Sequence, residues 1–248
     1  MSSGATPLLR LEAVSKAYRN LRVIEGLSLD IHKGELVGVI GPNGAGKTTL
    51  FGLIAGEHRP DSGQIYLGEQ NVSHLSASQR CRAGIARTFQ IPRPFADLTV
   101  FENALVGSCF GTHRAGVDAE DLAASALSMV GILDRANQNA SSLTLLQRKQ
   151  LEIARAIATN PQVILLDEVA GGLTERETVR LVELVRSLND SGVTVIWIEH
   201  LVHALTSVAK RLVVLDKGQV VCDGDARSVM EHETVKEIYL GTDPDVAA

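Results

Sequence analysis

The residues at positions 41–49 read G-P-N-G-A-G-K-T-T, and these residue types at this spacing predict a loop that binds phosphate groups. Residues 36–40 form an apolar run typical of a buried strand, and residues 50–55 continue the loop as a short helix that ends at Gly56. Glycines let backbone N–H groups wrap around a phosphate chain, and a helix N-terminus adds a favourable dipole. The alternative is an ordinary glycine turn, which would not require every fixed position of the motif.

Each residue of this loop has an expected place around a nucleotide. Lys47 is expected to reach the β- and γ-phosphates, and the Thr48 hydroxyl is expected to complete the coordination of Mg²⁺. The residues of the loop that we expect to contact the nucleotide are Gly41, Pro42, Asn43, Gly44, Ala45, Gly46, Lys47, Thr48 and Thr49.

An acidic pair follows a second apolar run. Asp167 and Glu168 come directly after residues 163–166, and open α/β sheets bind ligands at the carboxyl ends of such strands. Asp167 is suited to hold Mg²⁺ through a water molecule, on the side of the metal opposite Thr48. Glu168 suits the orientation or deprotonation of an attacking water. The alternative is an exposed acidic loop after a core strand.

A histidine ends the next predicted strand in the same way. His200 follows the apolar residues 193–198, so its imidazole could contact a γ-phosphate and hold the geometry of the water. His203 lies three residues further on, but the sequence shows no third or fourth ligand that would make a metal site of the two. We therefore interpret His203 as an ordinary helix residue.

Composition limits the class of protein. A chain of 248 residues, rich in aliphatic and poor in aromatic residues (4%), is long enough for one α/β core with a parallel sheet under helices. The formal net charge of −5 argues against a dedicated nucleic-acid-binding protein. The three cysteines lie far apart, which indicates a reducing compartment and no metal cage. Residues 1–7 do not resemble a signal peptide and no apolar run could span a membrane, so we expect a cytosolic chain unless a partner holds it elsewhere.

Hydrophobic periodicity divides the chain into a core and an insertion. Strands are predicted for residues 8–31, with a turn at positions 19–20, and for residues 64–67, 163–166, 193–198, 212–215 and 219–222. Residues 92–160 carry a helical pattern, with alanine-rich segments at 118–130 and 147–159. Thr174 opens another helix through a capping box with Glu177. The pattern therefore predicts a nucleotide-binding α/β core interrupted by a helical subdomain.

Taken together, these residues resemble one family closely, the ATPase subunits of ABC transporters. The resemblance covers the chain from Leu8 to Gly241. Asp167 and Glu168 match the family's Walker B pair, and His200 matches its switch histidine. Gln90 matches the glutamine that contacts Mg²⁺ and links the site to the membrane subunit. Tyr18 lies where the family places an aromatic ring that stacks on adenine.

The resemblance implies a fold class and a domain organisation. The fold is an α/β, RecA-like P-loop NTPase core with an antiparallel β subdomain and a helical subdomain. A single ABC ATPase domain would span residues 8–241, with the core and β subdomain at about 8–90 and 161–241 and the helical subdomain at about 91–160. Residues 1–7 and 242–248 would be flexible tails.

The resemblance also implies cofactors and partners. The cofactors are ATP and Mg²⁺, with Thr48, Gln90 and Asp167 around the metal. The partners are a second ABC ATPase subunit, identical or different, transmembrane permease subunits, and a periplasmic or extracellular solute-binding protein, with no nucleic acid. The chain would lie on the cytoplasmic face of the inner membrane and power transport by hydrolysing ATP.

In this family ATP lies between two subunits, and the signature of one faces the phosphate loop of the other. The signature position here, usually S-G-G-Q, is occupied by Thr144, Leu145, Leu146 and Gln147. Because leucines replace both glycines, we expect Leu146 to disfavour a glycine-only backbone conformation and a close approach to phosphate. The two ATP sites should then be unequal if the partner is a different chain. Val169 and Thr174 also depart from the family, which often has proline and usually has aspartate there.

Within the family, the chain most resembles the ATPases of branched-chain amino acid importers, in residues 86–90, 151–156 and 238–241. Close relatives serve urea, short amides, aromatic acids and lipopolysaccharide export, and the sequence does not separate these cargoes. Two other classes are a soluble ABC ATPase without a transport role and a small-molecule P-loop kinase. A single cassette with a short spacing between Lys47 and Asp167 argues against the first, and the matches at Gln90 and His200 argue against the second.

A short segment after Gln90 has few charges. Residues 91–101 include Ile91, Phe95 and Leu98, and we expect them to form part of a groove that receives a coupling helix from the membrane subunit. The alternative is a proline-rich turn that packs locally.

Overall fold

The computed structural model describes residues 6–111 and 118–240, with only the backbone described at positions 239 and 240. Gly241, the first five residues of the expected tail 1–7, and the whole of the expected tail 242–248 lie outside the described residues. Within the described ranges, no helix has both the length and the apolar character needed to cross a membrane.

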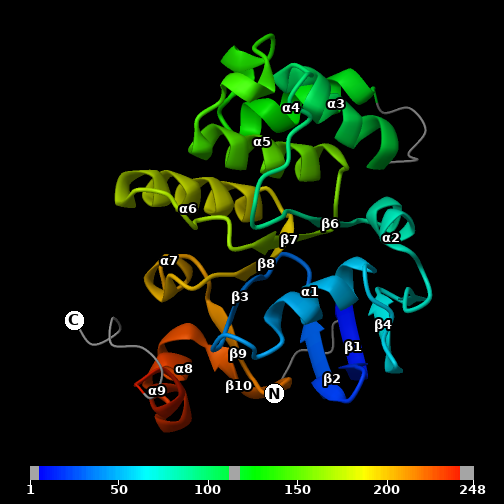
Figure 1. The fold of residues 1–248 in the computed structure, drawn as a ribbon, viewed down its shortest axis with the longest axis vertical. Helices are drawn as coiled ribbons and strands as arrows, with labels where there is room; N and C mark the ends of the chain where they lie inside the picture. Colours follow the sequence, from blue (N-terminus) through cyan, green and yellow to red (C-terminus); the bar gives the residue numbers. More distant parts are fainter. Residues whose placement is uncertain (1–5, 112–117, 241–248) are drawn as a thin grey trace.

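A six-stranded sheet runs through the centre of the molecule (Figure 1). Its strands, in spatial order, are β10 (Gln219–Asp225), β9 (Arg211–Asp216), β3 (Leu36–Ile40), β8 (Thr194–Ile198), β7 (Val163–Asp167) and β6 (Ile85–Arg87). All neighbours from β9 to β6 pair in parallel, and only β10 pairs antiparallel, with β9. The carboxyl ends of β3, β8, β7 and β6 therefore lie at one edge of the sheet.

Both faces of this sheet are buried, because alternate residues of each strand enter different hydrophobic clusters. On β7, Val163 and Leu165 belong to one cluster, whereas Ile164 and Leu166 belong to the other. The strand β8 divides its residues between the same two clusters. Burial on two sides explains why these strands are continuous apolar runs rather than alternating ones.

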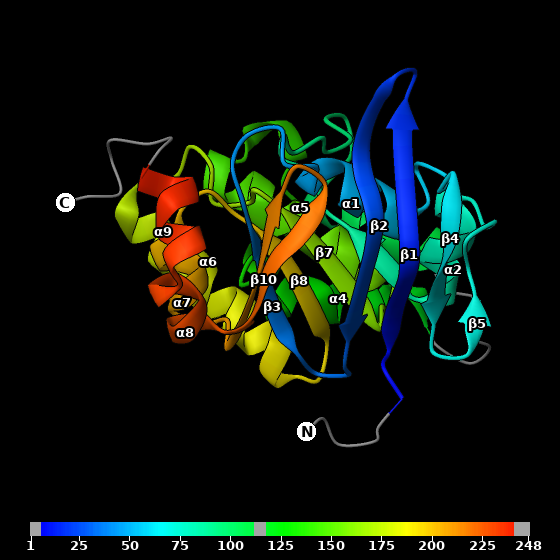
Figure 2. The ribbon, with the colours of Figure 1, turned by 90° about the horizontal axis from the view of Figure 1, so that it is seen from below.

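A second, antiparallel sheet covers one face together with α1 (Lys47–Ala55). Its strands, in spatial order, are β2 (Leu21–Ile31), β1 (Leu9–Tyr18), β4 (Ser62–Leu67) and β5 (Gln70–Asn71). Figure 2 shows β2 and β1 running side by side, with β4 on the far side of β1. The short α2 (Ala77–Ala83) connects this sheet to β6.

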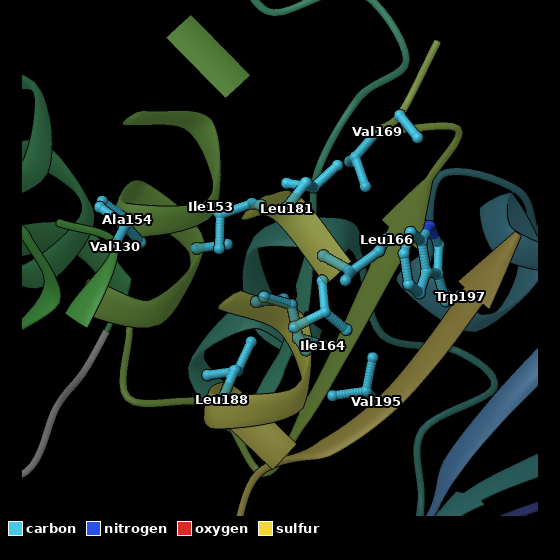
Figure 3. Packing of buried hydrophobic residues seen from close by; sticks show 14 of the residues in the cluster. Val130, Ile153, Ala154, Ile164, Leu166, Val169, Leu181, Leu188, Val195 and Trp197 are labelled. Atoms are coloured by element: carbon cyan, nitrogen blue, oxygen red, sulfur yellow. The ribbon is translucent and has the colours of Figure 1, made fainter. Parts of the chain in front are cut away.

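The opposite face carries helices. A helical group stands above the sheet in Figure 1 and consists of α3 (Val100–Gly111), α4 (Ala119–Met129) and α5 (Leu145–Ala158), with short 3-10 turns η1 (Leu133–Arg135) and η2 (Ala140–Ser142). The helix α6 (Glu175–Asp190) lies between this group and the sheet, and Figure 3 shows its residues Leu181 and Leu188 near Ile164 and Leu166 of β7. The remaining helices are α7 (Val202–Thr206), α8 (Ala226–Glu231) and α9 (Glu233–Leu240).

The expected fold class is confirmed, and the differences from the sequence expectations are local. The helix expected at 147–159 begins at Leu145, because Thr144 accepts a hydrogen bond from the Gln147 N–H and the Gln147 side chain accepts one from Thr144 in return. The sequence analysis did not identify α2, although Ser76 and Gln79 form a capping box of the same kind. Both capping boxes, and the one at Thr174, are readable from residue spacing alone.

Arg80 caps the carboxyl-terminal end of α1. Its side chain is fully buried and donates hydrogen bonds to the carbonyl oxygens of Ile54 (2.9 Å), Ser73 (3.0 Å) and Leu75 (3.3 Å). Burial lowers the pKa of Arg80 to about 10, so the side chain remains charged at neutral pH. A cation at this position also interacts favourably with the carboxyl end of the helix dipole.

We expect Arg80→Leu to lower the free energy of unfolding by at least about 2 kcal/mol, because several buried carbonyl groups lose their donor. Equilibrium urea denaturation measures this loss. Arg82→Leu, an exposed change on the same helix, is the matched control and should change the free energy by no more than about 0.5 kcal/mol. Equal effects of the two substitutions would contradict the capping role of Arg80.

Candidate functional site

The loop between β3 and α1 presents backbone N–H groups to one open space. The N-cap of α1 is Gly46, which has φ 102° and no side chain to occupy the helix N-terminus, and the first turn contains no acidic residue. The first amide groups of a helix have no intrahelical acceptor. They are therefore free to bind an anion, as the motif predicts.

Two glycines of this loop are required by close contacts. A Cβ atom on Gly41 would lie 2.0 Å from the carbonyl oxygen of Leu215, and one on Gly46 would lie 2.8 Å from that of Val23. Any larger residue would push the loop away from β9 or β2. The loop is thus held tightly against the two sheets that flank it.

An open cavity of about 200 Å³ brings the loop together with the ends of two strands. Its lining consists of Val23, residues 43–49, Glu168 and His200. Thus Lys47, Thr48, Glu168 and His200, which are far apart in sequence, surround one space. This arrangement follows from the parallel pairing of β3, β8 and β7.

Glu168 is the centre of the polar contacts at this cavity. Its Oε1 lies 2.8 Å from Nε2 of His200, and its Oε2 accepts a hydrogen bond from the side-chain amide of Gln90. The carboxylate is thereby held from two sides, by His200, two residues after β8, and by the segment after β6. The side chain of His200 is about half exposed, so it remains accessible to a ligand.

Lys47 points back into its own loop. Its ammonium group donates hydrogen bonds to the carbonyl oxygens of Gly41 (2.6 Å) and Pro42 (3.1 Å). Burial lowers the pKa of Lys47, while the negative charges of Glu168 and Asp167 act in the opposite direction. A buried ammonium group that faces carboxylates is suited to bind the oxygens of a phosphate.

The structure adds a residue that the sequence analysis missed. The guanidinium group of Arg87 pairs with Oδ2 of Asp167 at 2.6 Å and with Glu57 at 2.7 Å. Burial raises the pKa of Asp167, and the hydrogen bond and charge of Arg87 lower it. Arg87 ends β6, the strand next to β7. A charged residue at the end of a short apolar run was the only sequence signal for this contact.

Several expected site residues lie outside the cavity lining. Tyr18 is exposed at the end of β1, with its ring edge-on to His58 at a centroid distance of 5.6 Å. Asp167 and Gln90 do not line the cavity, although Gln90 contacts Glu168, which does. The signature residues Thr144, Leu145, Leu146 and Gln147 begin α5, away from the loop of the same chain.

The backbone at the signature is regular. Leu145 and Leu146 lie in the first turn of a helix, and neither has a positive φ. The side chain of Leu146 is buried, and that of Leu145 is exposed. Leu146 therefore does not adopt the glycine-only conformation that we expected it to disfavour.

Comparison with known proteins places this arrangement in a family. A protein-family model described as "ABC transporter" matches residues 24–171. The chain is also 36% identical over 250 residues to the high-affinity branched-chain amino acid transport ATP-binding protein LivG of Salmonella typhimurium, a match that covers 95% of this chain and 98% of LivG. The chain belongs to the ABC transporter ATPase family.

Further relatives agree with this assignment. The lipopolysaccharide export system ATP-binding protein LptB of Escherichia coli is 33% identical over 235 residues, which cover 95% of this chain and 98% of LptB. The structure of the ADP conformation of MJ1267, an ATP-binding cassette of an ABC transporter, matches with a TM-score of 0.87 and 29% identity over 96% of this chain and all of that one. A dimeric post-hydrolysis structure of the cassette MJ0796 with ADP and Pi matches with a TM-score of 0.78 and 26% identity, over 88% of this chain and 99% of that one.

The residues of this ABC ATPase fit ATP and Mg²⁺. The loop supplies free amide groups, a buried lysine and glycines that leave no room for a side chain, which together suit a phosphate chain. A hydroxyl on Thr48, a carboxylate on Asp167 and an amide on Gln90 are oxygen donors of the kind that Mg²⁺ prefers. The expected resemblance and the expected ATPase activity are confirmed by the family assignment.

We expect Lys47→Ala to weaken ATP binding by at least about tenfold, because a charge-assisted hydrogen bond to phosphate contributes roughly 1.5–3 kcal/mol. Isothermal titration calorimetry with ATP and Mg²⁺ measures the change. The control is Lys33→Ala, an exposed lysine just before β3 at the other end of that strand, which should bind ATP normally. If Lys47→Ala binds ATP as tightly as the control, Lys47 does not contact the phosphates.

Proposed function

We propose that this chain powers the uptake of branched-chain amino acids, or of a related small polar solute, by hydrolysing ATP. The observation that carries the proposal is a cavity in which the phosphate loop, Glu168 and His200 meet, in a chain similar to LivG along 95% of its length. A second candidate is a lipopolysaccharide-type exporter, which the similarity to LptB favours.

The geometry supports a division of roles among the site residues. Mg²⁺ and ATP supply the metal and the γ-phosphoryl group of the reaction. Lys47 and the amide groups of the loop would bind the phosphates, and Thr48, Gln90 and Asp167 would hold the metal, Asp167 through water. Tyr18 is exposed at the end of β1, where its ring is available to stack on adenine.

Glu168 acts on the water that attacks the γ-phosphate. Its two oxygens already accept hydrogen bonds, from Gln90 and His200, so the carboxylate has one defined orientation before water binds. A carboxylate in this position orients the water or takes its proton. His200, exposed on the cavity side, contacts the γ-phosphate and maintains the orientation of Glu168.

A second ABC ATPase subunit completes each site. The signature of this chain begins α5 after the N-cap Thr144, and its residues do not line the cavity of their own chain. The amide groups of Leu145 and Leu146 would be available to a phosphate bound by a partner subunit. Leu145 is exposed at this helix N-terminus, where its side chain would hinder the approach of the partner's bound phosphate. We therefore still expect the two ATP sites of a heterodimer to be unequal.

A second surface fits a transmembrane permease. A cavity of about 240 Å³ lies between α2, β6 and the helical group, with Arg87, Phe89, Glu152 and Arg155 in its lining. Phe89, Ile91 and Phe95 expose apolar surface beside it. Arg155 donates a hydrogen bond to the Arg93 carbonyl at 2.9 Å and lies 4.8 Å from the ring of Phe95, which fixes the segment to α5.

This surface would connect transport to hydrolysis. Gln90, in the same segment, donates to Glu168, so a helix from the permease that moves the segment also moves a contact of the catalytic carboxylate. In an importer, the permease would in turn receive cargo from a periplasmic or extracellular solute-binding protein. The chain would then be peripheral to the cytoplasmic face of the inner membrane.

We expect Glu168→Gln to bind ATP with unchanged affinity and to hydrolyse it at least about a hundredfold more slowly, because the amide cannot accept the proton of water. Steady-state ATPase assays measure the rate, and size-exclusion chromatography with ATP should show a dimer that persists. Glu183→Gln, a change on the outer part of α6, is the control for lost charge. A monomeric and fully active Glu168→Gln protein would contradict the role of Glu168.

The same variant tests the cargo in cells that lack the native chain. Uptake of radiolabelled leucine should return with the natural chain but not with Glu168→Gln. Normal leucine uptake in cells without the chain, together with a loss of surface lipopolysaccharide, would contradict the importer proposal and favour the exporter.

The docking surface is tested by a cysteine at Ile91, the most exposed apolar residue of the segment, with 67% of its surface accessible. In a chain whose three native cysteines are replaced by serine, Ile91→Cys should form a crosslink to a permease subunit that carries a cysteine on its cytoplasmic helices. Val221→Cys, on β10, provides the control and should form none. Crosslinks at the control but none at positions 91–98, in a complex that transports, would reject this surface.

A further inference from the structure

The loop from Glu168 to Thr174, which we name the β7–α6 loop, begins with an unfavourable backbone conformation. Glu168 has φ 47°, in the left-handed region, which costs a residue with a side chain roughly 1–2 kcal/mol. Such a conformation persists only when the surrounding contacts determine it. The position of the catalytic carboxylate therefore depends on what holds this loop.

Three hydrogen bonds hold the first half of the loop. The Glu168 N–H donates to the Ile198 carbonyl at 2.9 Å, and the Gly171 N–H donates to the Glu168 carbonyl at 3.3 Å. The third bond comes from a side chain, since the Ala170 N–H donates to Oε1 of Glu199 at 2.6 Å. This last bond is the shortest of the three and reaches across from the neighbouring strand.

Glu199 is not among the residues proposed to bind the phosphates or the metal. It is a carboxylate with only 3% of its surface exposed, and it lies between Ile198, which ends β8, and His200. Burial raises the pKa of Glu199, whereas the hydrogen bond from the Ala170 amide lowers it. Burying a carboxylate is costly, so its position requires a compensating interaction.

A buried cation of the helical group lies within electrostatic range of this carboxylate. Lys149 on α5 is 3% exposed, and its ammonium group forms no ion pair with a carboxylate of the described residues. Burial lowers its pKa, and the negative charges of Glu199 and then Glu168 raise it. The charge of Lys149 is thus opposed by those of the two glutamates at the end of the sheet.

The same helix contacts the second half of the loop. Leu145 lies one turn before Lys149, so both side chains share a face of α5. Its Cδ2 atom lies 3.3 Å from the point where a side chain on Gly172 would begin. The first turn of the signature helix therefore borders the β7–α6 loop of its own chain.

We propose that Glu199 is a positioning residue for Glu168, which it holds through the Ala170 amide. The inference rests on the proposed catalytic role of Glu168. Leu145 at the start of α5 borders the same loop, so the loop that carries Glu168 is supported both by the residue after β8 and by the signature helix of its own chain.

The inference predicts which kinetic constant changes. Glu199 contacts neither the phosphate loop nor the cavity, so Glu199→Ala should leave the KM for ATP within about twofold of the natural value. The turnover number should fall by about 10- to 100-fold, because a small displacement of a catalytic group can cost a factor of that size. ATPase assays on the full-length chain measure both constants.

Two further variants separate positioning from folding. Glu199→Gln removes the charge but keeps an oxygen that accepts from the Ala170 amide, whereas Glu199→Met has a similar size and no such oxygen. Glu199→Gln should therefore turn over faster than Glu199→Met. This comparison remains valid if Glu199→Ala does not fold.

Thr194→Val provides the matched control. Thr194 is a buried residue at the other end of β8 and accepts the Gly34 N–H at 3.0 Å, so it has the same kind of contact far from the cavity. This variant should lose stability to heat but keep its turnover number.

Two outcomes would overturn the inference. One is a Glu199→Ala protein that, like the control, is less stable but keeps its turnover number. The other is a Glu199→Gln protein no faster than Glu199→Met. In either case, activity of the natural chain and its loss in Glu168→Gln would leave the proposed function intact. A natural chain that neither binds nor hydrolyses ATP would instead overturn the proposed function itself.

Discussion

The parallel pairing of β7 with β8, and of β8 with β3, is the constraint on which the site depends. Asp167 pairs with Ile198 and Ile198 with Val39, so three strand ends reach the same edge of the sheet in register. The phosphate loop follows one of these ends, Glu168 the second and His200 the third. The distance of 2.8 Å between Glu168 and His200 is a consequence of this register. A slip of one residue in β7 would turn Glu168 to the other face of the sheet.

The parts of this arrangement that the sequence predicted are those encoded by local pattern. A glycine-rich loop between an apolar run and a helix predicts phosphate binding. An acidic pair directly after a buried strand must lie at the carboxyl end of that strand. The capping boxes at Thr144 and Thr174 likewise depend on residues three positions apart. Each of these features needs only its neighbours in the chain, so each could be predicted without the fold.

The parts that could not be predicted are contacts between distant segments. Arg87 at the end of β6 pairs with Asp167 at the end of β7, and Glu199 after β8 holds Ala170 after β7. No residue spacing indicates which charged side chain will be buried, because that depends on the packing of a whole layer. The helical backbone at Leu145 and Leu146 was likewise not predicted, since the expected helix began at residue 147, although the N-cap at Thr144 accounts for it.

The buried charges at this edge of the sheet come in opposed sets on different elements. Lys47 belongs to α1, Arg87 to β6 and Lys149 to α5, and the carboxylates that oppose them end or follow β7 and β8. Because an unpaired buried charge is costly, the ion pair of Arg87 with Asp167 ties β6 to the end of β7. A phosphate chain brings further negative charge to this edge, and it competes with the loop carbonyl groups for Lys47. The same electrostatic balance that stabilises the resting arrangement is therefore altered by the ligand, and the elements that carry Arg87 and Lys149 are the ones placed to respond.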